Sequence, residues 1–199
     1  MIVPSDHQAV IDEVARLSGA FAELISPLSE GGFNWQPPTL DRVARPAAAG
    51  AWSIGQCIEH LTRTGRLYLP RLQGAAERGR AAGRARRDGL RPNRIGRWFI
   101  AMLEPPVRMR VRAPKPSLLP SSTCEKAPTW RAFLEVQEEV AELVRSSSDL
   151  DLTRLRFRNP LLAGLPLFNL ATGFLVILAH ERRHLEQARA VRANADFPP

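Results

Sequence analysis

The sequence predicts an all-α protein in which four long helices pack as a four-helix bundle. Four long segments repeat apolar residues at the three- and four-residue spacing of an amphipathic helix, and no segment shows the alternation typical of a strand. The first and last connections between these segments are short, whereas the middle connection is long. A long connection can run the height of a bundle, so the second and third helices can point in the same direction.

The first helix is expected to start at a capping box formed by Ser5 and Gln8 and to end near Pro27 and Gly31–Gly32. His7 lies in its first turn and is expected on the surface. The apolar stripe of this helix consists of Val10, Ile11, Val14, Leu17, Phe21, Leu24, Ile25 and Leu28.

The second helix is predicted to follow a second capping box, Ser53 with Gln56, and Trp52 occupies the position that usually packs against the first turn. Its apolar stripe consists of Ile54, Ile58, Leu61, Tyr68 and Leu72. On a helical wheel, His60 falls at the edge of this stripe, a position that suits a ligand lining a cleft.

The middle connection is expected to span residues 73–128, with one short helix over 94–104, because prolines keep much of the remainder extended. The third helix is predicted to be capped by Thr129. The fourth is predicted over 170–193, with Asn169 as its cap. The whole chain, residues 1–199, is expected to form one domain, because its hydrophobic content of 44% and charged content of 24% are those of a globular protein.

The run from His180 to His184 is the most specific chemical feature of the chain. Residues i and i+4 of a helix lie about 40° apart around the axis and about 6 Å apart along it, so both imidazoles can reach one metal ion. The chain has four histidines, and His60 supplies a third ligand from another predicted helix. Three imidazoles are the ligand set of catalytic zinc sites that keep one coordination position open.

Two other interpretations of this histidine pair are less favoured. The zincin protease motif also contains His-Glu-x-x-His, but its extended form needs glycine and histidine where this chain has Gln187 and Ala190. Two polar residues on an exposed helix end would need no metal. However, the face that carries them is largely apolar, and burying uncoordinated imidazoles is costly.

The neighbours of the pair suggest further roles. Glu181 is a weak candidate for a catalytic base or ligand-orienting group, although a salt bridge to a neighbouring arginine is the favoured interpretation. Arg182 and Arg183 can bind a substrate carboxylate, or they can be solvated residues near the end of a helix. Gly173, almost two turns before His180 on the same face, is expected to leave room for substrate above the ion.

Three runs, residues 33–37 (FNWQP), 51–61 (AWSIGQCIEHL) and 180–187 (HERRHLEQ), resemble the signatures of the DinB-like superfamily, and the resemblance covers nearly the whole chain. It implies a four-helix bundle in up-down-down-up order that is often a homodimer. It also implies a divalent metal, commonly nickel or zinc, on His60, His180 and His184. Members of known activity include thiol transferases that use bacillithiol or mycothiol and a thiol-dependent maleylpyruvate isomerase, and others are classed as metal-dependent hydrolases.

The net charge of +8 comes almost entirely from arginine, since Lys115 and Lys126 are the only lysines. Eight arginines fall between Arg78 and Arg97 against a single acidic residue, which can attract nucleic acid or anionic lipid. A solvated connection is the favoured interpretation, because no aromatic side chain interrupts the cluster before Trp98.

Other features exclude several classes of protein. The two cysteines are far apart in the sequence, which argues against a disulfide framework. The N-terminus lacks a basic region followed by an apolar stretch, so we expect no secretory signal and a cytoplasmic protein. The uncharged stretch 161–179 contains Pro166 and Asn169, and a buried helix is expected there in place of a membrane span.

Together these observations favour a metal-dependent enzyme acting on a small molecule. The metal would ionise either a low-molecular-weight thiol, for S-transfer or isomerisation, or a water, for hydrolysis. The alternatives are a non-catalytic metal-binding or DNA-associated helical bundle, and a bundle that has kept the fold but lost the activity.

Overall fold

The computed structural model describes residue 4 and residues 6–38, 52–86, 89–106, 116–162 and 164–198. Its helices are α1 (His7–Ile25), α2 (Glu30–Asn34), α3 (Ile54–Ala81), α4 (Arg94–Leu103), the 3-10 helix η1 (Pro116–Leu118), α5 (Lys126–Ser146) and α6 (Leu170–Arg192). The strands of the described part are β1 (Arg156–Phe157) and β2 (Phe168–Asn169), which pair antiparallel. The all-α prediction is therefore confirmed.

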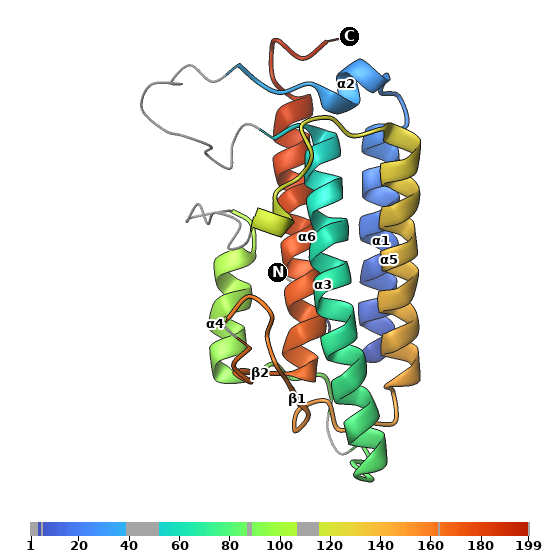
Figure 1. The fold of residues 1–199 in the computed structure, drawn as a ribbon, viewed down its shortest axis with the longest axis vertical. Helices are drawn as coiled ribbons and strands as arrows, with labels where there is room; N and C mark the ends of the chain where they lie inside the picture. Colours follow the sequence, from blue (N-terminus) through green and yellow to red (C-terminus); the bar gives the residue numbers. More distant parts are fainter. Residues whose placement is uncertain are drawn as a thin grey trace.

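The four long helices lie side by side (Figure 1). Helix α3 packs against α5 and α6, and α1 packs against the same two helices, while α4 covers the outer side of α6. In Figure 1, α1 and α6 run toward the end of the molecule where the C-terminus lies, and α3 and α5 run away from it. Helices α3 and α6 are thus antiparallel neighbours, so an early residue of α3 faces a late residue of α6.

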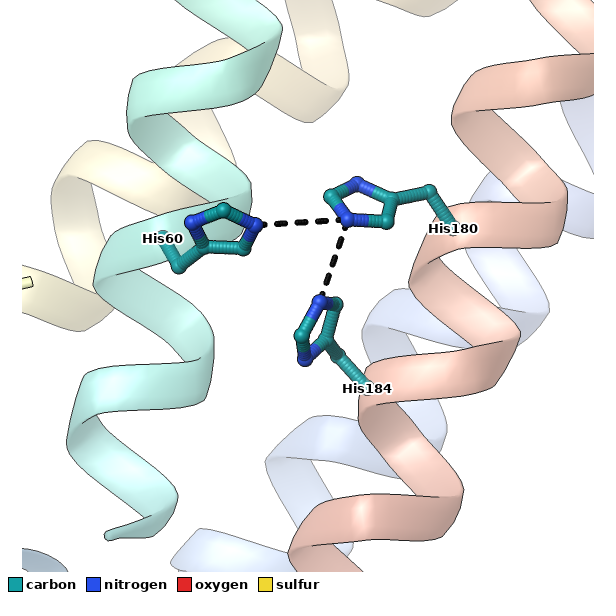
Figure 2. Close-up of side chains that lie close together, drawn as sticks. All are labelled: His60, His180 and His184. Carbon is teal, nitrogen blue, oxygen red and sulfur yellow. Dashed lines mark hydrogen bonds between the residues drawn. The ribbon is translucent and has the colours of Figure 1, made fainter. Parts of the chain in front are cut away.

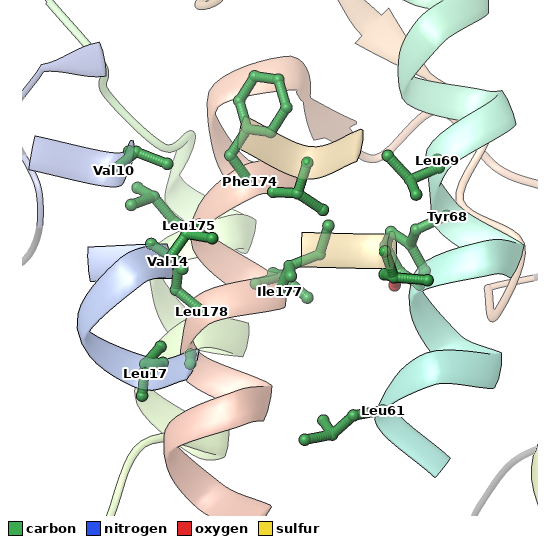
Figure 3. Close-up of a cluster of buried hydrophobic side chains, with 14 of the residues drawn as sticks. Val10, Val14, Leu17, Leu61, Tyr68, Leu69, Phe174, Leu175, Ile177 and Leu178 are labelled. Carbon is green, nitrogen blue, oxygen red and sulfur yellow. The ribbon is translucent and has the colours of Figure 1, made fainter. Parts of the chain in front are cut away.

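Residues of the apolar stripes predicted for α1 and α3, together with Leu69 and apolar residues of α6, form the core between these helices. Figure 3 shows Val10, Val14 and Leu17 of α1, Leu61, Tyr68 and Leu69 of α3, and Phe174, Leu175, Ile177 and Leu178 of α6, all of them buried. Burial of such stripes is the main source of stability for helices of this length.

Two helix starts that orient the histidines occur as predicted. At α3, the Gln56 backbone N–H donates to Ser53 Oγ at 3.1 Å, and the Ser53 N–H donates to Gln56 Oε1 at 3.0 Å, which completes the capping box. At α6, the Thr172 N–H donates to Asn169 Oδ1 at 2.9 Å. These caps satisfy backbone donors that the first turn leaves without partners, and so they set where each helix begins.

Other boundaries differ from the predictions. Helix α3 continues to Ala81, so the connection does not begin at residue 73; Ala75, Ala76 and Gly79 are buried there and allow close packing. Helix α5 begins at Lys126, before the predicted Thr129, with a proline in its first turn, where proline is tolerated. The short helix expected over 94–104 is confirmed as α4.

The N-terminal region also differs in detail. Helix α1 is capped by Asp6, whose side chain accepts from the Ala9 N–H at 2.9 Å, whereas the expected cap Ser5 lies outside the described residues. The Gly31–Gly32 pair, expected to end this helix, lies inside the separate short helix α2.

His7 is buried, at 7% exposure, so the expectation that it lies on the surface is wrong. Burial and the nearby Arg86 lower its pKa below the usual value. None of the described helices combines the length and the hydropathy that a bilayer span needs.

Candidate metal centre

The three predicted ligands meet between α3 and α6. Nε2 of His180 lies 3.3 Å from Nε2 of His60 and 3.1 Å from Nε2 of His184. The three rings point toward one another (Figure 2), and their ligand atoms all lie within 4.8 Å of one another. His60 and His184 are buried and His180 is partly exposed. The antiparallel packing of α3 and α6 thus joins residues that are far apart in the sequence, and the group could hold a metal ion.

The hydrogen positions available to this cluster favour a cation at its centre. A neutral imidazole carries one proton on its two nitrogens. Nδ1 of His60 lies 2.6 Å from the carbonyl oxygen of Leu118, which can only accept, so Nδ1 holds the proton and Nε2 carries a lone pair. A single proton on His180 Nε2 would then have to serve two neighbouring nitrogens.

A metal ion satisfies all three nitrogens at once, because each can donate a lone pair to it. Two nitrogens bound tetrahedrally at about 2.0–2.1 Å from zinc lie about 3.3 Å apart. The two Nε2 separations, 3.3 and 3.1 Å, are close to this value. The chemistry of the three residues and these two separations therefore fit a divalent metal.

The protonation of the cluster also suits metal binding. Burial lowers the pKa of His60, and it lowers the pKa of His180 and His184 well below the usual value of 6.5. The neighbouring imidazoles and Arg183 lower the last two further. The rings are consequently neutral at pH 7, the state in which histidine binds a metal.

Trp52 lies against two of the three ligands. The centroid of its ring is 4.8 Å from that of His60 and 5.8 Å from that of His184, and it stacks on His184 with 15° between the ring planes. Trp52 itself is partly exposed. Its place at the start of α3 was predicted from the sequence, but its contact with the proposed metal ligands was not.

Comparison with known proteins adds a family assignment to this geometry. The family model described as the DinB superfamily matches residues 13–188. The chain belongs to the DinB superfamily. No match is found among curated proteins or among solved structures.

In this DinB-superfamily chain, Glu181 is not one of the clustered ligands. It is buried, and its Oε1 accepts a hydrogen bond of 2.8 Å from Nε2 of Gln137 on α5. Within the described residues it forms no ion pair, so the expected salt bridge to an arginine is wrong. Burial raises its pKa to about 7.

The two arginines between the histidines are not solvated. Arg182 pairs with Glu13 of α1 at 2.7 Å and with Glu104, which follows α4, so its guanidinium already binds two protein carboxylates. Arg183 is buried, and burial lowers its pKa. The ion pairs of Arg182 therefore link α6 to α1 and to the end of α4. Because two protein carboxylates already occupy its guanidinium, Arg182 is not a candidate for binding a substrate carboxylate.

Gly173 does not leave room for substrate. A Cβ at this position would lie 2.5 Å from Cδ2 of Leu72 and 3.0 Å from the ring of Phe157. The absence of a side chain lets α3 and β1 pack directly on the backbone of α6. The prediction of a substrate space above Gly173 is wrong, because packing residues of this protein fill it.

Proposed function

We propose that this DinB-superfamily protein is a divalent-metal-dependent enzyme that acts on a small molecule. His60, His180 and His184 are the ligands in this proposal, and nickel or zinc is the metal, since imidazole nitrogen suits both. The convergence of three neutral Nε2 atoms carries the proposal. A bound divalent ion would lower the pKa of a thiol or a water at the open position and so supply the nucleophile at neutral pH.

The residues around the three histidines orient the rings and leave one side of the cluster accessible. The rings of His60 and His184 are held by their helices and by Trp52, which shields one side from water. His180 is the partly exposed ligand, and its side of the cluster is where a small molecule would approach. We favour a low-molecular-weight thiol as cosubstrate, for S-transfer or isomerisation, with hydrolysis as the second reaction class. We also assign the four long helices to a bundle of up-down-down-up order, supported by their pairwise packing.

The first experiment measures metal in protein purified without an affinity tag, in the parent and in three variants, His60→Ala, His180→Ala and His184→Ala. The expected result is close to one divalent ion per parent chain and its loss in each variant. His7→Ala is the matched control, because it removes the fourth histidine, which lies at the other end of the helices. Sub-stoichiometric metal in the parent after supply of nickel and zinc would contradict the proposal.

The second experiment measures turnover of a chromogenic electrophile with cysteine as the simplest thiol. Metal-loaded parent is expected to react faster than protein stripped with a chelator, and the three histidine variants are expected to match the stripped protein. Equal turnover by metal-free protein would exclude the thiol reaction. An ester tested in the same way distinguishes hydrolysis from thiol transfer.

A DNA-associated bundle is the second candidate, and one surface favours it. The described arginines between Arg78 and Arg97 are exposed, and Trp98 beside them is 65% exposed, a combination that can bind phosphates and stack on a base. This candidate predicts binding to a labelled oligonucleotide at low salt that weakens steeply with added salt. Replacing Arg91, Arg94 and Arg97 with glutamine would remove such binding. No binding at low salt would dismiss it.

A further inference from the structure

A segment that we call the strap, residues 116–124, lies across the first turns of α3. The carbonyl oxygen of Leu118 accepts the hydrogen bond from Nδ1 of His60 at 2.6 Å. The next carbonyl, that of Leu119, accepts from Nη1 of Arg63 at 2.5 Å. The strap thus touches the proposed metal ligand directly, through the ring nitrogen that points away from the other two histidines.

Four further hydrogen bonds hold the strap at Ser121. Its backbone N–H donates to Oε2 of Glu59 at 2.6 Å, and its hydroxyl donates to Oε1 of Glu59 at 2.9 Å. Nη2 of Arg63 donates to Ser121 Oγ at 2.9 Å and to Glu59 Oε1 at 2.7 Å. Nε2 of Gln56 donates to the Ser121 carbonyl at 2.8 Å. Every polar group that Ser121 offers is therefore bonded to α3.

The residues that hold the strap share one face of α3 with His60. Glu59 and His60 each lie three or four residues from both Gln56 and Arg63, so the four side chains lie next to one another on the helix surface. Cys124, at the end of the strap, also donates from Sγ to Oε2 of Glu59 at 3.4 Å. The Glu59 carboxylate is therefore the common acceptor of this network, one residue before the ligand.

We propose that Glu59 and Arg63 are positioning residues for His60, which they act on through the strap. Their hydrogen bonds hold the Leu118 carbonyl against Nδ1, and this carbonyl fixes both the tautomer and the orientation of the ring. Nε2 is then left with its lone pair directed at His180. An outer hydrogen bond of this kind commonly sets the tautomer of a histidine that binds a metal. This inference rests on the proposed metal site, but it concerns a state of His60 that exists without metal.

The test compares Glu59→Ala with Glu77→Ala, an exposed glutamate on the same helix. Zinc and nickel dissociation constants are measured by competition with a chromophoric chelator. Loss of an outer-shell partner typically weakens metal affinity about 10- to 100-fold, so we expect that loss for Glu59→Ala and none for Glu77→Ala. Arg63→Ala, matched with Arg66→Ala, is expected to act in the same direction.

A second readout follows the tautomer of His60 in metal-free protein, from the ¹⁵N shifts of the imidazole nitrogens at a pH where the ring is neutral. The parent is expected to show protonated Nδ1 alone, and Glu59→Ala a mixture of both tautomers. If Glu59→Ala keeps both the metal affinity and the single tautomer, the positioning role is wrong. If the parent binds no metal but Glu59→Ala shows the expected change of tautomer, the proposed function fails while the positioning role stands.

Glu59→Gln covers the case in which the alanine variant does not fold. The glutamine keeps the shape and one acceptor for the Ser121 N–H, but it removes the charge that pairs with Arg63. The expected loss of metal affinity is smaller than for alanine and still larger than for Glu77→Gln. Equal affinity in the two glutamine variants, with the tautomer unchanged, would overturn the proposal.

Discussion

Along the contact between α3 and α6, the half around His60 is polar and the half around Leu72 is apolar. In the polar half, three imidazoles face one another, Trp52 stacks on that of His184, and the strap is hydrogen-bonded to α3. In the apolar half, Leu72 and Phe157 pack directly on the backbone at Gly173. The two halves therefore have separable tasks: the apolar half stabilises the helix pair, and the polar half holds ligands that are costly to bury.

The largest expected effect comes from the apolar half. Phe157 is fully buried, and its ring centroid lies 6.0 Å from that of Tyr68 and 6.4 Å from that of Phe168. Replacing a buried phenylalanine with alanine typically costs about 3–5 kcal/mol of unfolding free energy, and we expect that loss for Phe157→Ala in urea titrations. The zinc affinity of the folded variant is expected to stay within about threefold of the parent, a difference below ~1 kcal/mol.

Leu134→Ala is the control for Phe157→Ala, because this leucine is 40% exposed and its truncation should change stability little. A tenfold loss of zinc affinity in folded Phe157→Ala would show that the two halves are coupled and would contradict the comparison.

The next effect depends on pH and comes from Glu181, the residue after His180, whose carboxylate faces α5. Burial raises the pKa of Glu181 from 4.5 to about 7 in the folded protein. Between these values Glu181 is more protonated in the folded than in the unfolded state, so its contribution to stability falls as pH rises. The favourable contribution is complete below pH 4.5 and is lost as pH rises through 7, a change on the order of 3 kcal/mol.

Glu181→Gln removes this titration, so the unfolding free energy of the variant minus that of the parent is expected to rise between pH 5 and 8, whereas the contributions of the buried histidines cancel in this difference. Urea unfolding in the presence of a chelator at a series of pH values measures the difference. Glu139→Gln, at an exposed position of α5, should follow the parent. Parallel pH profiles for Glu181→Gln and the parent would show that Glu181 is ionised in the folded protein throughout this range.

A smaller effect is expected where α3 meets α5. A Cβ at Gly65 would lie 2.4 Å from Cγ1 of Val136, and a β-branched side chain has little freedom to move. Overpacking lowers the free energy of unfolding by about 1–3 kcal/mol. Replacing a helical glycine with alanine raises it by about 1 kcal/mol through helix propensity. We therefore expect Gly65→Ala to lose about 1 kcal/mol in chemical unfolding.

Gly19→Ala is the matched control for Gly65→Ala. Nothing lies within 4 Å of a Cβ at Gly19, which is inside α1. Only the gain in helix propensity remains there, so stability should rise by about 0.5–1 kcal/mol. If both variants are stabilised, α5 can move away from α3, and the packing at Gly65 is looser than the distances indicate.

The parts of this molecule that could be predicted are those governed by local sequence. The caps at Ser53 and Asn169 depend on residues within three positions, and the spacing of His180 and His184 follows from the helical repeat. The approach of His60 to this pair required only antiparallel packing of the two helices. All three elements were therefore accessible from the sequence.

The strap could not be predicted, because its contacts join α3 to a segment about 60 residues later that has no periodic pattern. Gly173 was misassigned because a missing side chain in the sequence does not show whether substrate or Leu72 fills the space. His7 was misassigned because its burial depends on the packing of α1 against distant parts of the chain, including residues near Arg86. In each case the residues that make the contact are far apart in the sequence, so a local pattern does not reveal it.

The smallest effect is spectroscopic and concerns Trp52, which is one of four tryptophans and lies against two proposed ligands. Nickel bound by the three histidines would sit within a few ångströms of this indole, where a paramagnetic ion quenches fluorescence. Addition of nickel to the parent is expected to remove the share of emission that Trp52 contributes. Trp52→Phe should bind nickel with little change in emission, whereas Trp98→Phe, at an exposed position of α4, should be quenched like the parent. Equal quenching in Trp52→Phe and the parent would show that nickel binds away from the polar half of the α3–α6 contact. That result would contradict the proposed metal site.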